Sequence, residues 1–453
     1  MFKKILIANR GEIAVRIIRA CKEMGIETVA IYSTADRTSL HTQLADEAIC
    51  IGGPKAKDSY LNMGAIIEAA IDTGCEAIHP GFGFLSENSE FANLVKKCHL
   101  TWIGPDGDVI DALGNKSKAR EMMIANNVPV VPGTEGSVKD FNELKEVVDR
   151  IGYPVLIKAS AGGGGRGMRR AYSSDELEEA YNTAKAEAKA AFGDDDMYVE
   201  KLVINPKHVE FQILADNFGN TVYLGERDCS IQRRNQKMIE ESPCKILTEE
   251  LRQKMGNDAV KAAKAAHYTN AGTVEFVLAP NGDYYFIEMN TRIQVEHPVT
   301  EMVTGIDLIK EQIRIAEGLK LRFKQEEIKI QGHAIECRIN VEDPHHNFAP
   351  CPGKITTLHI PGGMGVRVDT HVYQGYEISP FYDSMVAKVI VHAPTRIEAI
   401  KKMRRVLSEL VVDGVKTNQT ILFYIFHSKD YVKGKFDTGF MDAHLEEMLE
   451  DNG

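Results

Sequence analysis

The stretch Ile287-Glu-Met-Asn-Thr-Arg-Ile-Gln-Val-Glu-His-Pro298 places a charged or amide-bearing residue at every second position. Side chains of a β-strand point to opposite faces in turn, so one face of a strand here would carry Glu288, Asn290, Arg292, Gln294 and Glu296. A row of carboxylates, amides and a guanidinium is not typical of a solvated surface. The pattern predicts a site for a metal ion and a small anion.

A β-hairpin is predicted directly upstream, where two apolar runs rich in strand-forming residues flank Asn281-Gly282. In a symmetric hairpin centred on this turn, Glu275 and Glu288 lie opposite each other on the same face. Two like charges in that position destabilise a sheet unless a cation lies between them. Taken alone, the hairpin favours two ordinary exposed glutamates; with residues 290–296 it predicts a Mg²⁺ or Mn²⁺ site.

Composition narrows the class of protein. The chain has 453 residues and a net charge of −11, which argues against a nucleic-acid partner. Its eight cysteines are scattered singly without a Cys-x-x-Cys pair, as expected for a reducing compartment and no zinc site. The N-terminus has too few apolar residues for a signal peptide, and no later apolar run could span a bilayer. We therefore expect a cytoplasmic protein without a membrane partner.

The N-terminal region predicts a βαβ unit. Residues 5–8 form a short buried-strand run, residues 13–24 carry an apolar helical stripe, and residues 28–32 form a second strand. This order predicts a parallel sheet in a first domain of residues 1–115. The turn Asn9-Arg10-Gly11-Glu12 lacks the Gly-x-Gly-x-x-Gly pattern, which argues against a dinucleotide-binding Rossmann domain.

Two further domains are expected. Residues 116–330 contain a smaller α+β unit at about 133–202 and then the metal hairpin. Residues 331–453 are richer in strands and predict a mixed or antiparallel sheet. The predicted fold class is therefore α/β and α+β in three domains.

A glycine run interrupts the smaller unit. The strand 154–158 is followed by Gly162 to Gly165 and Arg166, and Met168 begins a second strand. Consecutive glycines let backbone N–H groups approach a phosphate closely, and Lys158 adds positive charge. Because no helix opens directly after the glycines, neither a P-loop nor a Rossmann loop fits. A mobile lid over nucleotide phosphates is the interpretation we prefer to a floppy surface loop.

Other polar segments are ambiguous by themselves. Residues 197–203 predict a strand whose backbone could bind a base, and His208, Glu210 and Gln212 alternate with apolar residues on another strand. Taken alone, His208 is more readily a half-buried structural histidine than a ligand. Residues 232–237 bring three cations into a predicted loop, and local evidence favours a solvated charge run there.

Placed together, these segments make the chain resemble the ATP-grasp superfamily and, within it, the biotin carboxylases. The resemblance covers essentially the whole chain and is carried by residues 7–14, 79–88, 158–168, 225–234, 288–298 and 382–385. It implies a three-domain ATP-grasp enzyme with a parallel-sheet N-terminal domain and a mobile glycine-rich lid in the central domain. The ATP-grasp element alone would be shared with carbamoyl-phosphate synthetases and several peptide-type ligases.

The resemblance also implies which residues form the site. ATP would be held by Lys116, Lys158, Gly164, Gly165, Glu200, Lys201, Leu202, Val203, His208, Gln232, Glu275 and Glu288. Two Mg²⁺ or Mn²⁺ ions would be held by Glu275, Glu288 and Asn290. Bicarbonate would lie among Lys237, Arg292, Gln294 and Val295, with Glu296 as its base. Biotin would contact Arg338 and Phe82.

The implied reaction is the first half-reaction of acetyl-CoA carboxylase, which feeds malonyl-CoA and fatty-acid synthesis. ATP and bicarbonate would form carboxyphosphate, and biotin on a separate biotin carboxyl carrier protein would be carboxylated. The chain has no Met-Lys-Met motif on which to carry its own biotin. Carboxyltransferase subunits and a second copy of the chain are the other implied partners, with dimer contacts near Arg16, Arg19, Gly363 and Arg367.

Two positions depart from the family pattern. Phe82 stands where a tyrosine is common, and Asn235 stands where a histidine is often found beside the nucleotide. Two alternatives stay open at this point. One is the same half-reaction in a pyruvate- or propionyl-CoA-type carboxylase, and the other is a non-catalytic, nucleotide-binding regulatory protein.

Overall fold

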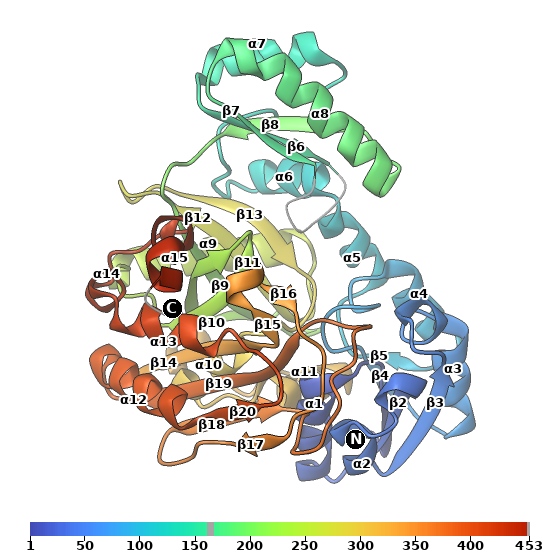
Figure 1. Cartoon of the computed structure of the whole chain (residues 1–453). Coiled ribbons are helices and arrows are strands. Elements are labelled where there is room, and N and C mark those ends of the chain that lie inside the picture. Colours follow the sequence, from blue (N-terminus) through green and yellow to red (C-terminus); the bar gives the residue numbers. More distant parts are fainter. Residues whose placement is uncertain (161–166, 451–453) are drawn as a thin grey trace.

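The computed structural model describes residues 1–160 and 167–450 (Figure 1). The N-terminal region is a five-stranded parallel sheet in the order β3-β2-β1-β4-β5, as predicted. Its strands are β1 (Lys4–Ile7), β2 (Glu27–Ser33), β3 (Glu47–Gly52), β4 (Ala77–His79) and β5 (Thr101–Trp102). Its helices are α1 (Gly11–Glu23), α2 (Leu40–Leu44), α3 (Met63–Asp72), α4 (Ser89–Lys97) and α5 (Gly107–Gly114).

A smaller unit stands apart from the rest of the molecule, at the top of Figure 1. It is an antiparallel sheet in the order β7-β6-β8 with α7 and α8 packed against it. Its elements are α7 (Phe141–Ile151), β6 (Val155–Ala159), β7 (Met168–Ala171), α8 (Ser174–Phe192) and β8 (Met197–Lys201), and α6 (Lys116–Ala125) precedes them. The strands on both sides of the glycine run pair as predicted. Gly164 and Gly165 lie outside the described residues.

An eight-stranded antiparallel sheet forms the centre, in the order β13-β12-β9-β10-β11-β14-β19-β18. Its strands are β9 (Lys207–Ala215), β10 (Thr221–Arg233), β11 (Gln236–Ser242), β12 (Asn270–Leu278), β13 (Tyr284–Asn290), β14 (His333–Asn340), β18 (Val366–Thr370) and β19 (Met385–Ala393). Because β11 pairs with β14, the sheet continues across the boundary expected at residue 330. Side chains far apart in the sequence therefore share one face.

Helices cover this sheet and fill the C-terminal region. They are α9 (Glu249–Ala265), α10 (His297–Thr304), α11 (Leu308–Ala316), α12 (Arg396–Glu409), α13 (Gln419–His427), α14 (Lys429–Lys433) and α15 (Phe440–Glu450). Short strands and 3₁₀ turns are β15 (Glu342–Asp343), β16 (Ala349–Pro350), β17 (Thr357–His359), β20 (Val411–Asp413), η1 (Thr34–Asp36), η2 (Ala56–Asp58), η3 (Gln325–Glu327) and η4 (Pro344–His346). Within the described ranges, no helix combines the length and apolar character that crossing a membrane requires.

The predicted pairing of the metal hairpin is confirmed, because Glu275 lies opposite Glu288 in the β12–β13 register. The turn is wider than Asn281-Gly282 alone, since Leu278 pairs with Tyr284 and the Ala279 N–H donates to the Asp283 carbonyl. A register shift directly after Glu275 compensates for the wider turn. The two carboxylates thus stay opposite each other although the loop differs.

The strand predicted over residues 287–298 is wrong beyond Asn290. β13 ends at that residue, the chain turns, and α10 begins at His297 with Glu296 as its N-cap residue. Pro298 explains the difference, because its fixed φ and missing N–H suit the first turn of a helix and not a continuing strand. The polar side chains therefore converge around a turn instead of following one strand face.

The loop predicted over residues 232–237 is also wrong. β10 continues to Arg233 and β11 begins at Gln236, so Gln232 and Lys237 face each other on a β-hairpin. Arg234 and Asn235 form its turn with φ values of 51° and 64°. Two successive positive φ angles are what a tight two-residue hairpin requires. Lys237 consequently lies on a strand of the central sheet and not in a solvated loop.

Candidate active site

Lys237 is the centre of a buried cluster of carboxylates. Its ammonium donates to Glu210 at 2.5 Å, to Glu296 at 2.6 Å and to Glu275 at 3.0 Å. These partners come from β9, the N-terminal cap of α10 and β12. Three carboxylates outnumber one ammonium, so further cations must balance the cluster.

Arg227, on β10, is one of those cations, and its side chain is fully buried. Its guanidinium donates to Glu210 at 2.5 Å, Gln294 at 2.9 Å, Gln212 at 2.8 Å, Thr300 at 3.0 Å and Thr273 at 3.1 Å. These five contacts join three strands, the turn after β13 and helix α10. Arg227 therefore fixes where Glu210 and Gln294 stand.

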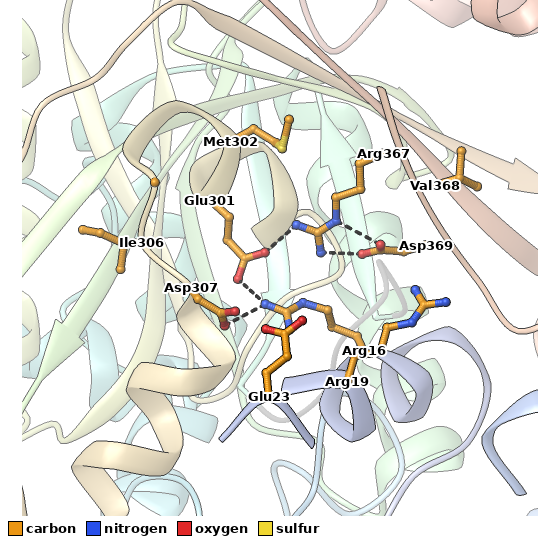
Figure 2. Close-up of a pocket in the computed structure, with 11 residues that line it drawn as sticks. Arg16, Arg19, Glu23, Glu301, Met302, Ile306, Asp307, Arg367, Val368 and Asp369 are labelled. Carbon is orange, nitrogen blue, oxygen red and sulfur yellow. Dashed lines mark hydrogen bonds and ion pairs between the residues drawn. The ribbon is translucent and has the colours of Figure 1, made fainter. Parts of the chain in front are cut away.

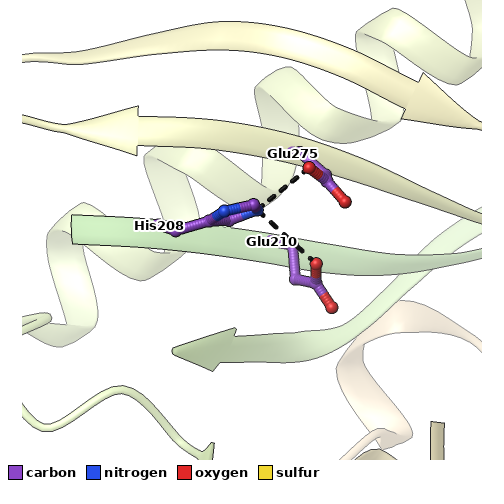
Figure 3. A group of neighbouring side chains, drawn as sticks. All are labelled: His208, Glu210 and Glu275. Carbon is purple, nitrogen blue, oxygen red and sulfur yellow. Dashed lines mark ion pairs between the residues drawn. The ribbon is translucent and has the colours of Figure 1, made fainter. Parts of the chain in front are cut away.

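His208 lies beside Glu275, with its Nε2 atom 2.9 Å from one carboxylate oxygen and 3.8 Å from Glu210 (Figure 3). The three side chains come from adjacent strands, and their ligand atoms all lie within 4.8 Å of one another. Burial alone would raise the pKa of Glu275, but Lys237 and His208 hold it well below its usual value. Glu275 is therefore ionised at neutral pH. Thus His208, which local evidence left as a structural residue, lies within the cluster.

The residues at the hairpin fit a hard divalent cation. Glu288 lies opposite Glu275 and pairs with Lys116 at 2.8 Å, while Asn290 donates its amide to Glu275 at 2.8 Å. Two facing carboxylates and an amide are oxygen ligands of the kind that Mg²⁺ and Mn²⁺ prefer.

Glu296 is almost fully buried, at 2% exposure, between two cations. One oxygen accepts from Lys237 at 2.6 Å, and the other accepts from Arg338 at 3.0 Å. Burial opposes ionisation, but Lys237, Arg338 and Arg227 hold the pKa of Glu296 well below its usual value. The side chain is therefore a carboxylate, the form that can accept a proton.

Arg292 and Gln294 lie on the turn after β13. Arg292 donates to Glu87 at 2.8 Å, and Gln294 donates to Glu275 at 2.9 Å. A cavity of about 350 Å³ opens here, and its lining includes Glu87, Lys116, Glu288, Asn290 and Arg292. Glu87 belongs to the N-terminal region, so this region closes one side of the cavity.

Val295 and Phe82 meet at a buried lysine. The Val295 carbonyl accepts from Lys388 at 2.8 Å, and the Phe82 ring centre lies 6.0 Å from the same ammonium. Lys388 pairs with Arg338 across β19 and β14. The residues implied for bicarbonate and for biotin are thus neighbours.

The described residues implied for ATP come from α6, from the strands of the small unit and from the central sheet. Lys158 pairs with Glu200, and the backbone N–H groups of Lys201 and Leu202 donate to the carbonyls of Pro132 and Pro154. Those two N–H groups are therefore occupied within the protein. The Lys201 ammonium donates to the Tyr153 carbonyl at 2.6 Å. Val203 follows in an irregular segment.

Several residues of this site received no role from the sequence: Glu87, Glu210, Arg227, Glu240 and Lys388. Glu87 and Arg227 fall inside motifs that carry the family resemblance, and Glu210 belongs to an alternating polar strand face. The sequence therefore drew attention to the segments of Glu87, Arg227 and Glu210, although it assigned these residues no role. Glu240 belongs to no motif that carries the resemblance and Lys388 stands in an apolar run, so only the sheet register brings them to the site.

A second cavity, of about 390 Å³, lies at the far end of α10 (Figure 2). Arg16 donates to Glu301 at 2.9 Å and to Asp307 at 2.7 Å. Arg367 donates to Glu301 at 2.7 Å and to Asp369 at 2.6 Å. Arg19 and Glu23 complete the rim without a contact to this network in Figure 2. Three of the residues expected at a dimer interface, Arg16, Arg19 and Arg367, thus line one hollow.

Family models match three successive segments of the chain. Residues 1–110 match the biotin carboxylase N-terminal domain, and residues 336–443 match the biotin carboxylase C-terminal domain. Residues 115–324 match the ATP-binding domain of the carbamoyl-phosphate synthase L chain.

Relatives and solved structures match over nearly the full length. The chain is 55% identical to biotin carboxylase 1 of Bacillus subtilis (strain 168), covering 98% of this chain and 99% of the relative. It is 54% identical to a pyruvate carboxylase subunit of Methanothermobacter thermautotrophicus, covering 98% and 90%. A crystal structure of the biotin carboxylase domain dimer of Hydrogenobacter thermophilus 2-oxoglutarate carboxylase, with MgADP, ADP and bicarbonate, matches with a TM-score of 0.95. It is 52% identical and covers 99% of both chains.

Proposed function

The chain belongs to the biotin carboxylase family of ATP-dependent ligases, and from that premise we propose that it carboxylates biotin on a carrier protein within an acetyl-CoA carboxylase. The observation that supports this most directly is the placement of Glu296. A buried carboxylate held between Lys237 and Arg338 provides a base beside two cationic sites for anionic substrates.

Bicarbonate is a weak nucleophile because its single negative charge is delocalised, and removal of its proton makes its oxygens more nucleophilic. In the proposed reaction it lies among Lys237, Arg292, Gln294 and the Val295 backbone, and Glu296 accepts its proton as it attacks the γ-phosphate of ATP. Lys237 stays close to Glu210 when Glu296 becomes neutral, so its charge remains balanced throughout the step. Arg227 keeps Gln294 in place because it donates to the amide oxygen.

Glu275, Glu288 and Asn290 would hold the divalent cation, which would neutralise charge on the transferring phosphoryl group. Lys116 and Lys158 would neutralise further negative charge on the phosphates of the nucleotide. Both lysines pair with glutamates in the structure and would exchange those partners for phosphate oxygens.

The product of the first step, carboxyphosphate, is labile and has to be kept from water. Glu87 from the N-terminal region lines one side of the cavity, and we propose that the small unit covers the nucleotide on the other. Breakdown of carboxyphosphate gives CO₂ and phosphate, and that phosphate accepts the N1′ proton of biotin. Arg338 then stabilises the negative charge on the ureido oxygen.

Release of ADP tests the proposal. The assay contains Mg²⁺ and ATP and is run with and without bicarbonate, and with and without free biotin. Bicarbonate-dependent release that biotin stimulates is the expected result. ADP release that does not depend on bicarbonate would instead indicate another ATP-grasp ligase. No ADP release at all would favour a nucleotide-binding regulatory protein.

A second candidate is the same half-reaction in a different complex, because similar relatives are subunits of pyruvate and 2-oxoglutarate carboxylases. The chemistry at Glu296 would be identical, so kinetics on free biotin cannot separate the two. Purification of the chain from its own cells with its carrier protein, followed by assays with acetyl-CoA, pyruvate and 2-oxoglutarate, separates them.

We also propose that the chain forms a homodimer through the surface around the second cavity. Arg19 and Glu23 are exposed there, and Met364 is 96% exposed on the nearby segment that contains Gly363. Substitution Arg19→Glu should convert the dimer to a monomer in sedimentation experiments. A dimer that persists unchanged would place the interface elsewhere.

A further inference from the structure

Two buried glutamates face each other behind Arg338. Glu240 on β11 lies directly opposite Glu336 on β14, and neither side chain is exposed. Opposite residues of an antiparallel pair bring their Cβ atoms to about 5 Å, so the two carboxyl groups are within reach of each other. Two ionised carboxylates at that separation in a dry sheet would repel strongly.

Their hydrogen bonding is unequal. One oxygen of Glu240 accepts from the Arg338 Nε atom at 2.6 Å, while its other oxygen has no partner among the described residues. Both oxygens of Glu336 lack a partner among those residues as well. A buried ionised carboxylate with no donor is strongly disfavoured, whereas a protonated one supplies its own donor.

The charges around the pair allow one negative charge and not two. Arg338 contacts Glu240 directly, and Lys388, opposite Arg338 on β19, is bound to the Val295 carbonyl and lies 3.1 Å from Glu12. Glu296 adds negative charge from the turn above, and Lys237 is already bound to three carboxylates.

Burial raises the pKa of Glu240 to about 7 and raises the pKa of Glu336 well above its usual value.

We propose that Glu240 and Glu336 share one proton and act as a positioning pair for Arg338. Glu336 is the neutral acid and donates its O–H to the free oxygen of Glu240. Glu240 keeps a single negative charge, which holds the Nε and Nη2 atoms of Arg338, each at 2.6 Å, while Nη2 also donates to Glu296 at 3.0 Å beside the proposed biotin site. This inference rests on the proposed role of Arg338 towards biotin.

The arrangement has a reason in charge balance. Arg338 already meets Glu296 at 3.0 Å, so a second full carboxylate at Glu336 would draw the guanidinium towards the sheet and away from its ligand. Loss of the shared proton would therefore displace Arg338, while loss of the Glu240 charge would leave it without an anchor. Both changes affect biotin, and neither touches the residues implied for ATP.

Steady-state kinetics with free biotin test the positioning role. We expect Glu240→Gln to lower kcat/KM for biotin by roughly 10- to 100-fold with KM for ATP unchanged, because a misplaced group costs rate in this range. Glu336→Ala should lower it similarly, and Glu336→Gln should restore most of the loss because its amide can donate to Glu240. The double variant Glu240→Gln/Glu336→Gln should resemble Glu240→Gln alone.

Infrared spectroscopy tests the shared proton without any turnover. At pH 8 the protein should show the C=O band of a buried protonated carboxyl, and Glu336→Gln should remove it. Glu226→Gln, a matched change at a buried glutamate paired with Arg252, should leave that band in place. A band that survives Glu336→Gln, or an unchanged kcat/KM in Glu240→Gln, would overturn the inference. Absence of biotin-stimulated ADP release in the unaltered protein would instead overturn the proposed function.

Discussion

Replacement of Glu296 by glutamine isolates its proposed task as a base. The substitution keeps the shape of the side chain but removes the negative charge that accepts the proton of bicarbonate. General-base catalysis contributes roughly 10²–10⁴ in rate, so kcat for bicarbonate-dependent ADP release should fall by about that factor. This corresponds to about 3–5 kcal/mol of transition-state stabilisation.

The structure also predicts which properties the Glu296→Gln substitution leaves unchanged, namely the stability of the buried cluster and the binding of ATP. Lys237 keeps Glu210 at 2.5 Å, and Arg338 keeps Glu240 at 2.6 Å, so neither buried cation is orphaned. The cost in stability should therefore stay below the roughly 3–5 kcal/mol of a broken buried pair. ATP binding should change little, because Lys116 and Lys158 pair with Glu288 and Glu200 and not with Glu296.

The assay compares kcat for ADP release with the ATP dissociation constant, measured by equilibrium titration. Glu226→Gln is the matched control, since it neutralises another buried glutamate of the central sheet whose partner is Arg252. Its kcat should stay within about threefold of the unaltered protein, which is under 1 kcal/mol. Normal turnover of Glu296→Gln, or a loss confined to the KM for biotin, would refute the assignment of Glu296 as the base for bicarbonate.

Three further outcomes are expected. Glu275→Gln should weaken Mn²⁺ binding, followed by electron paramagnetic resonance, by roughly tenfold or more, about 1.4 kcal/mol; equal affinity would move the cation site away from the hairpin. Arg227→Met should lower the free energy of unfolding, measured by urea titration, by about 3–5 kcal/mol, because Glu210 loses a buried partner. Arg252→Met should lower it by less, because the Arg252 side chain is more exposed than that of Arg227. Arg396 and His333 lower the pKa of Glu241 from its ordinary value of 4.5 to about 2, although burial alone would raise it. The ionised carboxylate therefore stabilises the fold fully above pH 4.5. This contribution to the free energy of unfolding is lost as the pH falls from 4.5 through the lowered pKa. Urea titrations at pH 7, 4 and 3 should therefore show a steeper acid loss in the unaltered protein than in Arg396→Gln, and parallel losses would contradict this.

Local patterns predicted the parts of the site that depend on neighbouring residues. The hairpin turn and the period-two alternation were enough to place Glu275 opposite Glu288, and the glycine run was correctly flanked by two paired strands. The same alternation misled beyond Asn290, where Pro298 determines a helix start. Periodicity describes one element at a time, so it could not bring Glu240 or Lys388 to Arg338; only the β11–β14–β19 register does that.

The buried charges at the centre of the sheet are better explained by the positions in which they hold the side chains of the site than by a contribution to the stability of the fold. Buried ion pairs are often no more stabilising than apolar side chains of similar volume, because both charges lose their hydration. Apolar clusters already supply stability, one around Phe211, Val274 and Phe276 and another around Ile335, Val389 and Leu407. Glu210, Arg227 and Lys237 contribute instead a fixed arrangement, in which each charge is held by partners from several strands. Such a frame keeps the buried Glu296 ionised, and that is what the proposed proton transfer from bicarbonate requires.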